Sequence, residues 1–222
     1  NSSWVNARFN EGLSQYCYRG WIGMNGVDVS YVNNNSNFNN SYKTPVAAIF
    51  TCATGDFNGG TSTTEAFLRK GSINNARGAV AAMGFATAAT HTAFNNAVVA
   101  GYYGGHHDLG LSAIGPAMFY GKYNLWATLP EGNSSAEAFG NRANLMGDPG
   151  MDVWQGVPTE VQIIYSEETL AFGRSSFEVE VMDMDNNPLA DMVVCAYQVD
   201  GIFERVLTNQ NGIAVISLFD AN

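Results

Sequence analysis

Two short stretches of almost uninterrupted apolar residues place the strongest constraint on how this chain can fold. They are residues 46–51, which lead directly into Cys52, and residues 78–85. A strand with one face in water alternates apolar and polar residues, whereas a strand covered on both faces is apolar throughout. The sequence therefore predicts buried strands, as in a parallel sheet with helices on both sides.

The first three quarters of the chain alternate such apolar runs with helical stretches, which is typical of an α/β layer fold. A further β-prone run covers residues 13–18 and ends before Arg19 and Gly20. Asn and Ser dominate residues 33–41. Because these side chains bond their own backbone in turns, that segment is predicted to be a loop.

Two helices are predicted within this α/β part. Ser62 and Glu65 have the spacing of a capping box, in which each side chain accepts a hydrogen bond from the other residue's backbone amide. A helix is therefore expected to begin at Ser62. A second helix is predicted over residues 115–129, with an apolar side made of Met118, Leu125 and Trp126.

The last quarter of the chain has a different pattern. Its apolar runs are short and are separated by turn sequences rich in Asn, Asp, Pro and Gly; they cover residues 177–181, 192–197, 206–208 and 213–217. This pattern predicts a small β-sandwich. With the boundary near Val157, we expect an α/β domain over residues 1–156 and a β-domain over residues 157–222, the latter lacking strands that would lie beyond Asn222.

Composition excludes several classes of protein and indicates where the chain works. The 222 residues include 10 Lys and Arg against 20 Asp and Glu, a net charge of −10, so no nucleic-acid partner is expected. No run approaches the roughly 18 apolar residues of a membrane span. Three widely spaced cysteines indicate no disulfide framework or zinc site. Abundant Asn, Gly, Ser and Thr, with four N-x-S/T triplets, favour an extracellular or cell-surface location.

Cys52 is the first candidate for a functional residue, because it follows a buried strand. Open α/β folds bind ligands at the carboxyl ends of their parallel strands. The alternative is that Cys52 is a small buried apolar residue, which is the common role of a free cysteine. Asp56, four residues further on, could orient groups near Cys52, bind a structural calcium ion or cap a turn.

An ordered set of motifs carries a resemblance to a known family. Residues 46–57, 65–69 and 78–81, supported by Tyr18-Arg19-Gly20, Gly121-Lys122, Gly147-Asp148-Pro149 and the β-domain that follows, resemble the gingipain family of cysteine endopeptidases. The resemblance implies a caspase-like α/β domain followed by an immunoglobulin-like β-sandwich. It also implies that Cys52 is the nucleophile, that no cofactor is required and that structural calcium is an option. The substrate would be a peptide or protein.

One position departs from that family. The general base of the family is a His that follows a Gly at the end of the preceding strand, and this position falls on Trp21. An indole carries only a donor N–H and cannot accept the proton of a thiol. His91 could act as a substitute if its loop reaches Cys52; the alternative is a loop histidine bonded to neighbouring threonine hydroxyls.

Two functional readings follow from this departure. The chain is either a secreted cysteine endopeptidase homologue or a non-catalytic homologue that serves in extracellular adhesion, assembly or structure. The adjacent His106 and His107 argue weakly for a metal site, because neighbouring side chains on an extended segment point in opposite directions.

The resemblance begins within the family's catalytic domain, so the α/β domain is expected to be N-terminally incomplete. The strand at residues 13–18 would then be an exposed edge. We therefore expect an association with the missing N-terminal portion of a precursor or with another chain.

Overall fold

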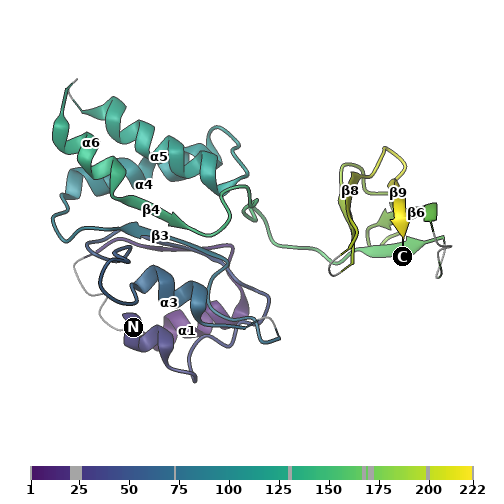
Figure 1. Ribbon diagram of the computed structural model, residues 1–222, viewed down its shortest axis with the longest axis horizontal. Coiled ribbons are helices and arrows are strands. Elements are labelled where there is room, and N and C mark those ends of the chain that lie inside the picture. The colour runs from purple at the N-terminus through teal and green to yellow at the C-terminus, as the bar shows by residue number, and fades with distance from the viewer. Residues whose placement is uncertain are drawn as a thin grey trace. The chain divides into compact units, whose positions relative to one another are not determined.

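The computed structural model describes residues 2–20, 27–72, 74–129, 132–166, 169, 173–198 and 201–221 (Figure 1). The chain divides into two units, Asn1–Val157 and Pro158–Asn222. Within the described ranges, no helix has both the length and the apolar character needed to cross a membrane.

A four-stranded sheet forms the centre of the first unit, with the strand order β1-β2-β3-β4. Its strands are β1 (Gln15–Tyr18), β2 (Val46–Ile49), β3 (Ala81–Phe85) and β4 (Ala143–Met146). The first three are parallel, and β4 pairs with β3 in the antiparallel sense. Every residue of β2 and β3 is buried, which confirms the prediction from their apolar runs. The α/β class with a parallel sheet is therefore correct.

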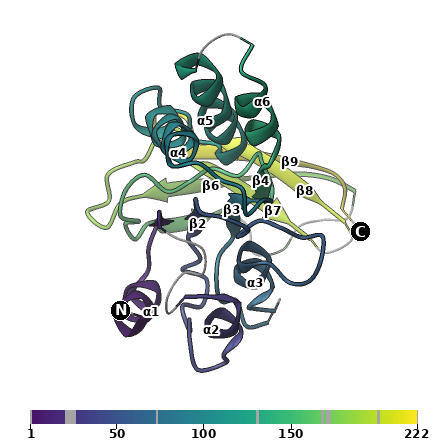
Figure 2. The ribbon, with the colours of Figure 1, turned by 90° about the vertical axis from the view of Figure 1, so that its left-hand side faces the viewer.

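Helices cover both faces of this sheet (Figures 1 and 2). On one side lie α1 (Ser2–Glu11), α2 (Val29–Asn33) and α3 (Thr63–Arg69); on the other lie α4 (Thr92–His107), α5 (Ile114–Thr128) and α6 (Ser134–Asn141). Alternate residues of β2 point to opposite faces of the sheet. Ala47 and Ile49 pack in the core that includes α1 and α3, whereas Val46 and Ala48 pack in the core that includes α4 and α5. The sheet thus separates two apolar cores.

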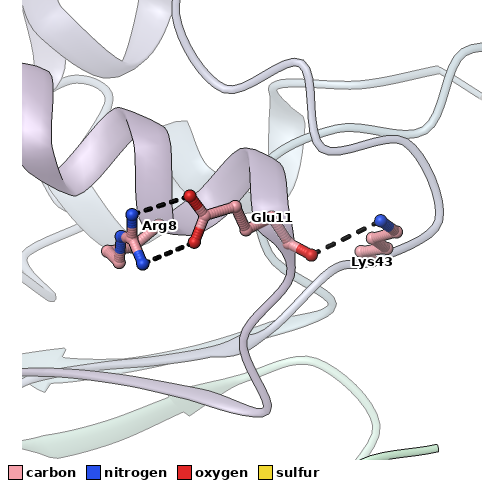
Figure 3. Close-up of polar contacts among 3 residues, drawn as sticks. All are labelled: Arg8, Glu11 and Lys43. Atoms are coloured by element: carbon pink, nitrogen blue, oxygen red, sulfur yellow. Dashed lines mark hydrogen bonds and ion pairs between the residues drawn. The ribbon is translucent and has the colours of Figure 1, made fainter.

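Helix α1 was not predicted from the sequence, because its ten residues bury only Phe9. At its C-terminus Gly12 adopts a φ of 106° and donates its amide proton to the carbonyls of Arg8 and Phe9. Glu11 forms an exposed ion pair with Arg8, and the Nζ of Lys43 donates to the carbonyl oxygen of Glu11 at 3.4 Å (Figure 3). A cation here complements the negative end of the helix dipole.

The capping box of α3 forms as predicted. The hydroxyl of Ser62 accepts from the amide of Glu65 at 3.3 Å, and the Glu65 carboxylate accepts from the amide of Ser62 at 2.7 Å. The hydrogen bonds from Ser62 hold the pKa of Glu65 below its ordinary value. Their contribution is therefore present above the unfolded pKa of Glu65 and is lost as the pH falls through the lowered value.

We expect Ser62→Ala to lower the free energy of unfolding of the first unit by about 1 kcal/mol, because it removes an N-cap acceptor. Urea unfolding followed by circular dichroism measures this change, with Ser62→Asn as a control that keeps a capping oxygen. Equal losses in both variants would show that the cap is not the cause.

Helices α4 and α5 cross at two glycines. A Cβ atom added to Gly101 would lie 2.8 Å from the Cα of Gly121, and one added to Gly121 would lie 2.8 Å from the carbonyl oxygen of Val98. The two backbones are therefore close enough that no side chain fits between them. The buried stripe of α5 comprises Ile114, Ala117, Met118, Gly121 and Leu125.

The prediction that Trp126 shares the apolar side of this helix is wrong. Trp126 is 63 % exposed, because it follows Leu125 around the helix and points away from the stripe that faces α4 and the sheet.

The described residues of the second unit form two sheets. One has the order β5-β6-β9, from Gln162–Tyr165, Gly173–Met182 and Ile213–Ala221; the other pairs β7 (Val193–Tyr197) with β8 (Phe203–Leu207). Its core consists of Val179, Val181, Ile216 and Leu218, with side chains from β7 and β8 packed against them. Strand β5 was not predicted from the sequence. The assignment of an immunoglobulin-like topology stays a prediction.

Candidate functional site

Cys52 lies in a tight turn at the carboxyl end of β2. The hydroxyl of Thr54 donates to the carbonyl oxygens of Ile49 at 2.8 Å and Thr51 at 2.9 Å, which closes the turn around Cys52. Ala53 occupies the left-handed region with a φ of 54°, and its amide donates to the carbonyl oxygen of Thr87 at 2.8 Å. A non-glycine residue held there stores backbone strain, as is common at functional sites. The turn leaves Cys52 half-buried.

The thiol of Cys52 contacts the loop that follows β3. Its Sγ lies 2.7 Å from the Oγ1 of Thr90, and either atom could donate the proton. Parallel neighbours β2 and β3 end at the same edge of the sheet, which brings this loop to Cys52 as predicted. Sequence reasoning selected His91 in this loop and missed Thr90.

His91 caps helix α4. Its Nδ1 accepts a hydrogen bond from the amide of Ala93 at 3.2 Å, and its ring packs against Phe94. A neutral imidazole that accepts at Nδ1 carries its proton on Nε2. The expected bond to a threonine hydroxyl is thus replaced by a helix cap. The role of His91 as a base for Cys52 stays a prediction.

Arg19 joins the end of β1 to the beginning of α4. Its Nε donates to the Oδ1 of Asn96 at 3.0 Å, its Nη1 to the carbonyl of Gly20 at 3.2 Å and its Nη2 to the carbonyl of Thr92 at 3.4 Å. The hydroxyl of Thr51, which precedes Cys52, donates to the same Gly20 carbonyl at 2.7 Å. Arg19, a residue of intermediate exposure, therefore lies beside the turn that carries Cys52.

The prediction of an extended segment at His106 and His107 is wrong, since both residues form the last turn of α4. The Nδ1–H of His106 donates to the carbonyl of Leu111 at 2.5 Å, and burial lowers the pKa of this imidazole. His107 stacks on Tyr103. No cluster of His, Cys, Asp and Glu in the described part of the chain could hold a metal ion.

Trp21 and Asp56 were also candidate site residues. Trp21, assigned to the base position, lies outside the described residues. Asp56 is exposed, and its Oδ1 accepts from the amide of Asn58 at 3.1 Å, as in a turn. A calcium role for Asp56 stays a prediction.

Comparison with known protein families identifies a family for the first unit. Residues 2–154 match the family model described as Peptidase family C25. A comparison with curated proteins gives no match.

Solved structures of peptidases are similar over nearly the whole chain. The crystal structure of the Arg-specific cysteine proteinase gingipain R matches with a TM-score of 0.68 and 19 % identity, covering 98 % of this chain and 49 % of that one. The complex of Porphyromonas gingivalis RgpB pro- and mature domains matches with a TM-score of 0.60 and 20 % identity, covering 96 % and 49 %. At these identities the likeness shows the fold. The chain spans about half the length of either structure.

Proposed function

This chain belongs to peptidase family C25, the gingipain-type cysteine peptidases, and on that premise we propose that its Cys52 site binds polypeptides without cleaving them. The observation that carries the proposal is the contact of Cys52 Sγ with the hydroxyl of Thr90. Catalysis by a thiol requires a group that takes its proton and later returns it to the leaving amine. A threonine hydroxyl does not titrate in the useful range and cannot serve as that base.

The three histidines of the chain support the same conclusion. His106 is buried, and its imidazole donates to the carbonyl oxygen of Leu111. His107 stacks on Tyr103. Both histidines lie in the last turn of α4, at the end of the helix opposite to His91. The Nδ1 lone pair of His91 is used by the cap of α4, so the neutral ring has no free lone pair to accept the proton of Cys52. We accordingly assign the chain a role in extracellular adhesion, assembly or structure.

A second function is favoured by the position of Thr90. Thr90 contacts Cys52, and the next residue in the chain is His91. If the imidazole of His91 released the cap of α4, it could turn toward the thiol of Cys52. The chain would then be a secreted cysteine endopeptidase with Cys52 as nucleophile and His91 as base.

Labelling with an electrophilic peptide probe for cysteine peptidases distinguishes the two functions. We expect Cys52 to react at the rate of an ordinary thiol, and we expect His91→Asn to leave that rate unchanged. Asn keeps a side-chain acceptor for the cap of α4 but removes the imidazole. A working base contributes about 10²–10⁴-fold. Rapid labelling that is lost by about this factor in His91→Asn, and abolished in Cys52→Ser, would establish the endopeptidase instead.

We also propose that the first unit associates with a polypeptide segment that is not part of this chain. Strand β1 is at the edge of the sheet, and its backbone pairs on one side with β2. An edge of this kind accepts another strand. The candidates are the N-terminal portion of a precursor and a separate chain; purification of the native complex identifies which, and a lone monomer in the native source would contradict the proposal.

A further inference from the structure

Arg19 holds a charge that no carboxylate in the described part of the chain neutralises. Its three hydrogen bonds go to the amide oxygen of Asn96 and to two backbone carbonyls. The ion pair found among the described residues is elsewhere, between Arg8 and Glu11. A guanidinium that is held in place beside a candidate site without a carboxylate partner can bind an anion supplied by the ligand.

The three bonds also fix the orientation of the guanidinium. This group has five N–H donors in a rigid plane. One donor each on Nε, Nη1 and Nη2 is engaged, which leaves one N–H on each Nη without an acceptor among the described residues. Two donors on neighbouring nitrogens match the two oxygens of one carboxylate.

The surroundings of Arg19 add positive potential. Its partners Thr92 and Asn96 belong to the first turns of α4, a helix of 16 residues whose N-terminus carries a partial positive charge. The nearest acid along the Cys52 loop is Asp56, and its carboxylate accepts from the amide of Asn58 rather than from Arg19. An anion at this edge would therefore meet two sources of attraction.

We propose that Arg19 is the specificity-determining residue of the Cys52 site and binds the carboxylate of an acidic side chain in a polypeptide ligand. The inference rests on the proposed function, since it names the class of polypeptide that the same site takes. A ligand strand that passes over the carboxyl edge of the sheet would place an Asp or Glu side chain against the two free N–H groups. A neutral Asn or Gln at that position would leave the charge of Arg19 unpaired.

Two alkylating reagents of nearly equal size test the proposal without any known ligand. Iodoacetate and iodoacetamide both form an S–C bond with the thiolate and release iodide, but the first carries a carboxylate. We expect the rate ratio of iodoacetate to iodoacetamide at Cys52 to exceed that of N-acetylcysteine by about threefold or more. Mass spectrometry of the tryptic peptides separates Cys52 from Cys17 and Cys195.

Two arginine variants test whether Arg19 causes the preference of Cys52 for iodoacetate over iodoacetamide. Arg19→Gln should reduce the ratio to that of N-acetylcysteine, whereas Arg142→Gln, which removes an exposed arginine at the C-terminal cap of α6, should leave it unchanged. A ratio equal to that of N-acetylcysteine in the wild-type chain, or an equal loss in both variants, would overturn the proposal. Because Arg19 also holds the start of α4, the wild-type ratio is measured at rising NaCl; a ratio that does not fall with salt contradicts the proposal without any variant.

Short peptides then test the class of ligand. A fluorescein-labelled peptide with a central Glu should bind the wild-type chain about fivefold more tightly than the same peptide with Gln, and Arg19→Gln should remove the difference. Equal binding of the two peptides by the wild-type chain would refute the acidic preference. This outcome is separate from the failure of the proposed function, because the ratio of two ligands or two reagents does not depend on whether His91 activates the thiol.

Discussion

Replacing Phe67 with alanine is expected to lower the free energy of unfolding of the first unit by about 4 kcal/mol. Phe67 is fully buried and lies at the centre of an aromatic cluster under the sheet. Its ring centroid is 5.6 Å from that of Phe9, 6.1 Å from that of Tyr16 and 5.4 Å from that of Phe38. These rings belong to α1, β1 and the α2–β2 connection, so truncation leaves a cavity that several elements would have to close at once.

Phe119→Ala is the matched control for Phe67→Ala, because Phe119 is 70 % exposed on α5. We expect this variant to change the free energy of unfolding by no more than about 0.5 kcal/mol. Urea unfolding monitored by tryptophan fluorescence measures both. A loss below 1 kcal/mol in Phe67→Ala, on the scale of a surface substitution, would mean that the aromatic cluster does not stabilise the unit.

Gly101→Ala is expected to destabilise the first unit by about 2 kcal/mol, although alanine is the better helix former. The added Cβ would lie 2.5 Å from the Cβ of Asn124, 2.8 Å from the Cα of Gly121 and 2.9 Å from the carbonyl oxygen of Tyr120. Backbone atoms of α5 cannot yield as a flexible side chain can. The two helices must therefore separate, which weakens the core between them and the sheet.

Gly104 lies on the same helix, and its replacement by alanine is expected to have the opposite effect on stability. A Cβ there would meet one carboxylate oxygen of Asp108 at 3.4 Å. Gly104→Ala should therefore raise the free energy of unfolding by about 0.5–1 kcal/mol through its higher helix propensity. Thermal unfolding of the two variants, recorded side by side, provides the comparison. Effects of the same sign at both glycines would show that the helix crossing does not govern them.

The sequence predicted the parts of the fold whose local pattern agrees with their surroundings. Strands β2 and β3 are apolar because both their faces are covered, and α3 begins at a capping box formed by residues three positions apart. Helix α4 was missed because Gly101, Gly104 and Gly105 lower its helix propensity. Its stability comes from contact with α5, which no local pattern records.

In the candidate site, the position of Cys52 was predictable from the sequence, but its contacts were not. The position of Cys52 follows from the end of an apolar strand. Its neighbours do not, because Thr90 and Arg19 come from different segments that meet only when β1, β2 and α4 are assembled. The selection of His91 came from its chemistry, whereas its observed contact is a helix cap that depends on where α4 begins.

The register of the sheets implies different rates of pairing for local and distant strands. In the first unit, Gln15 pairs with Val46 and Ala82 with Met146, so each strand must find a partner far along the chain. In the second unit, Gly173 of β6 pairs with the equally distant Ala221 of β9, whereas Val193 pairs with Leu207 across a short hairpin. Closing long loops costs entropy before any contact forms, which slows folding. During refolding of the full chain we therefore expect β7 and β8 to pair early, and the strands that form the Cys52 edge to pair later.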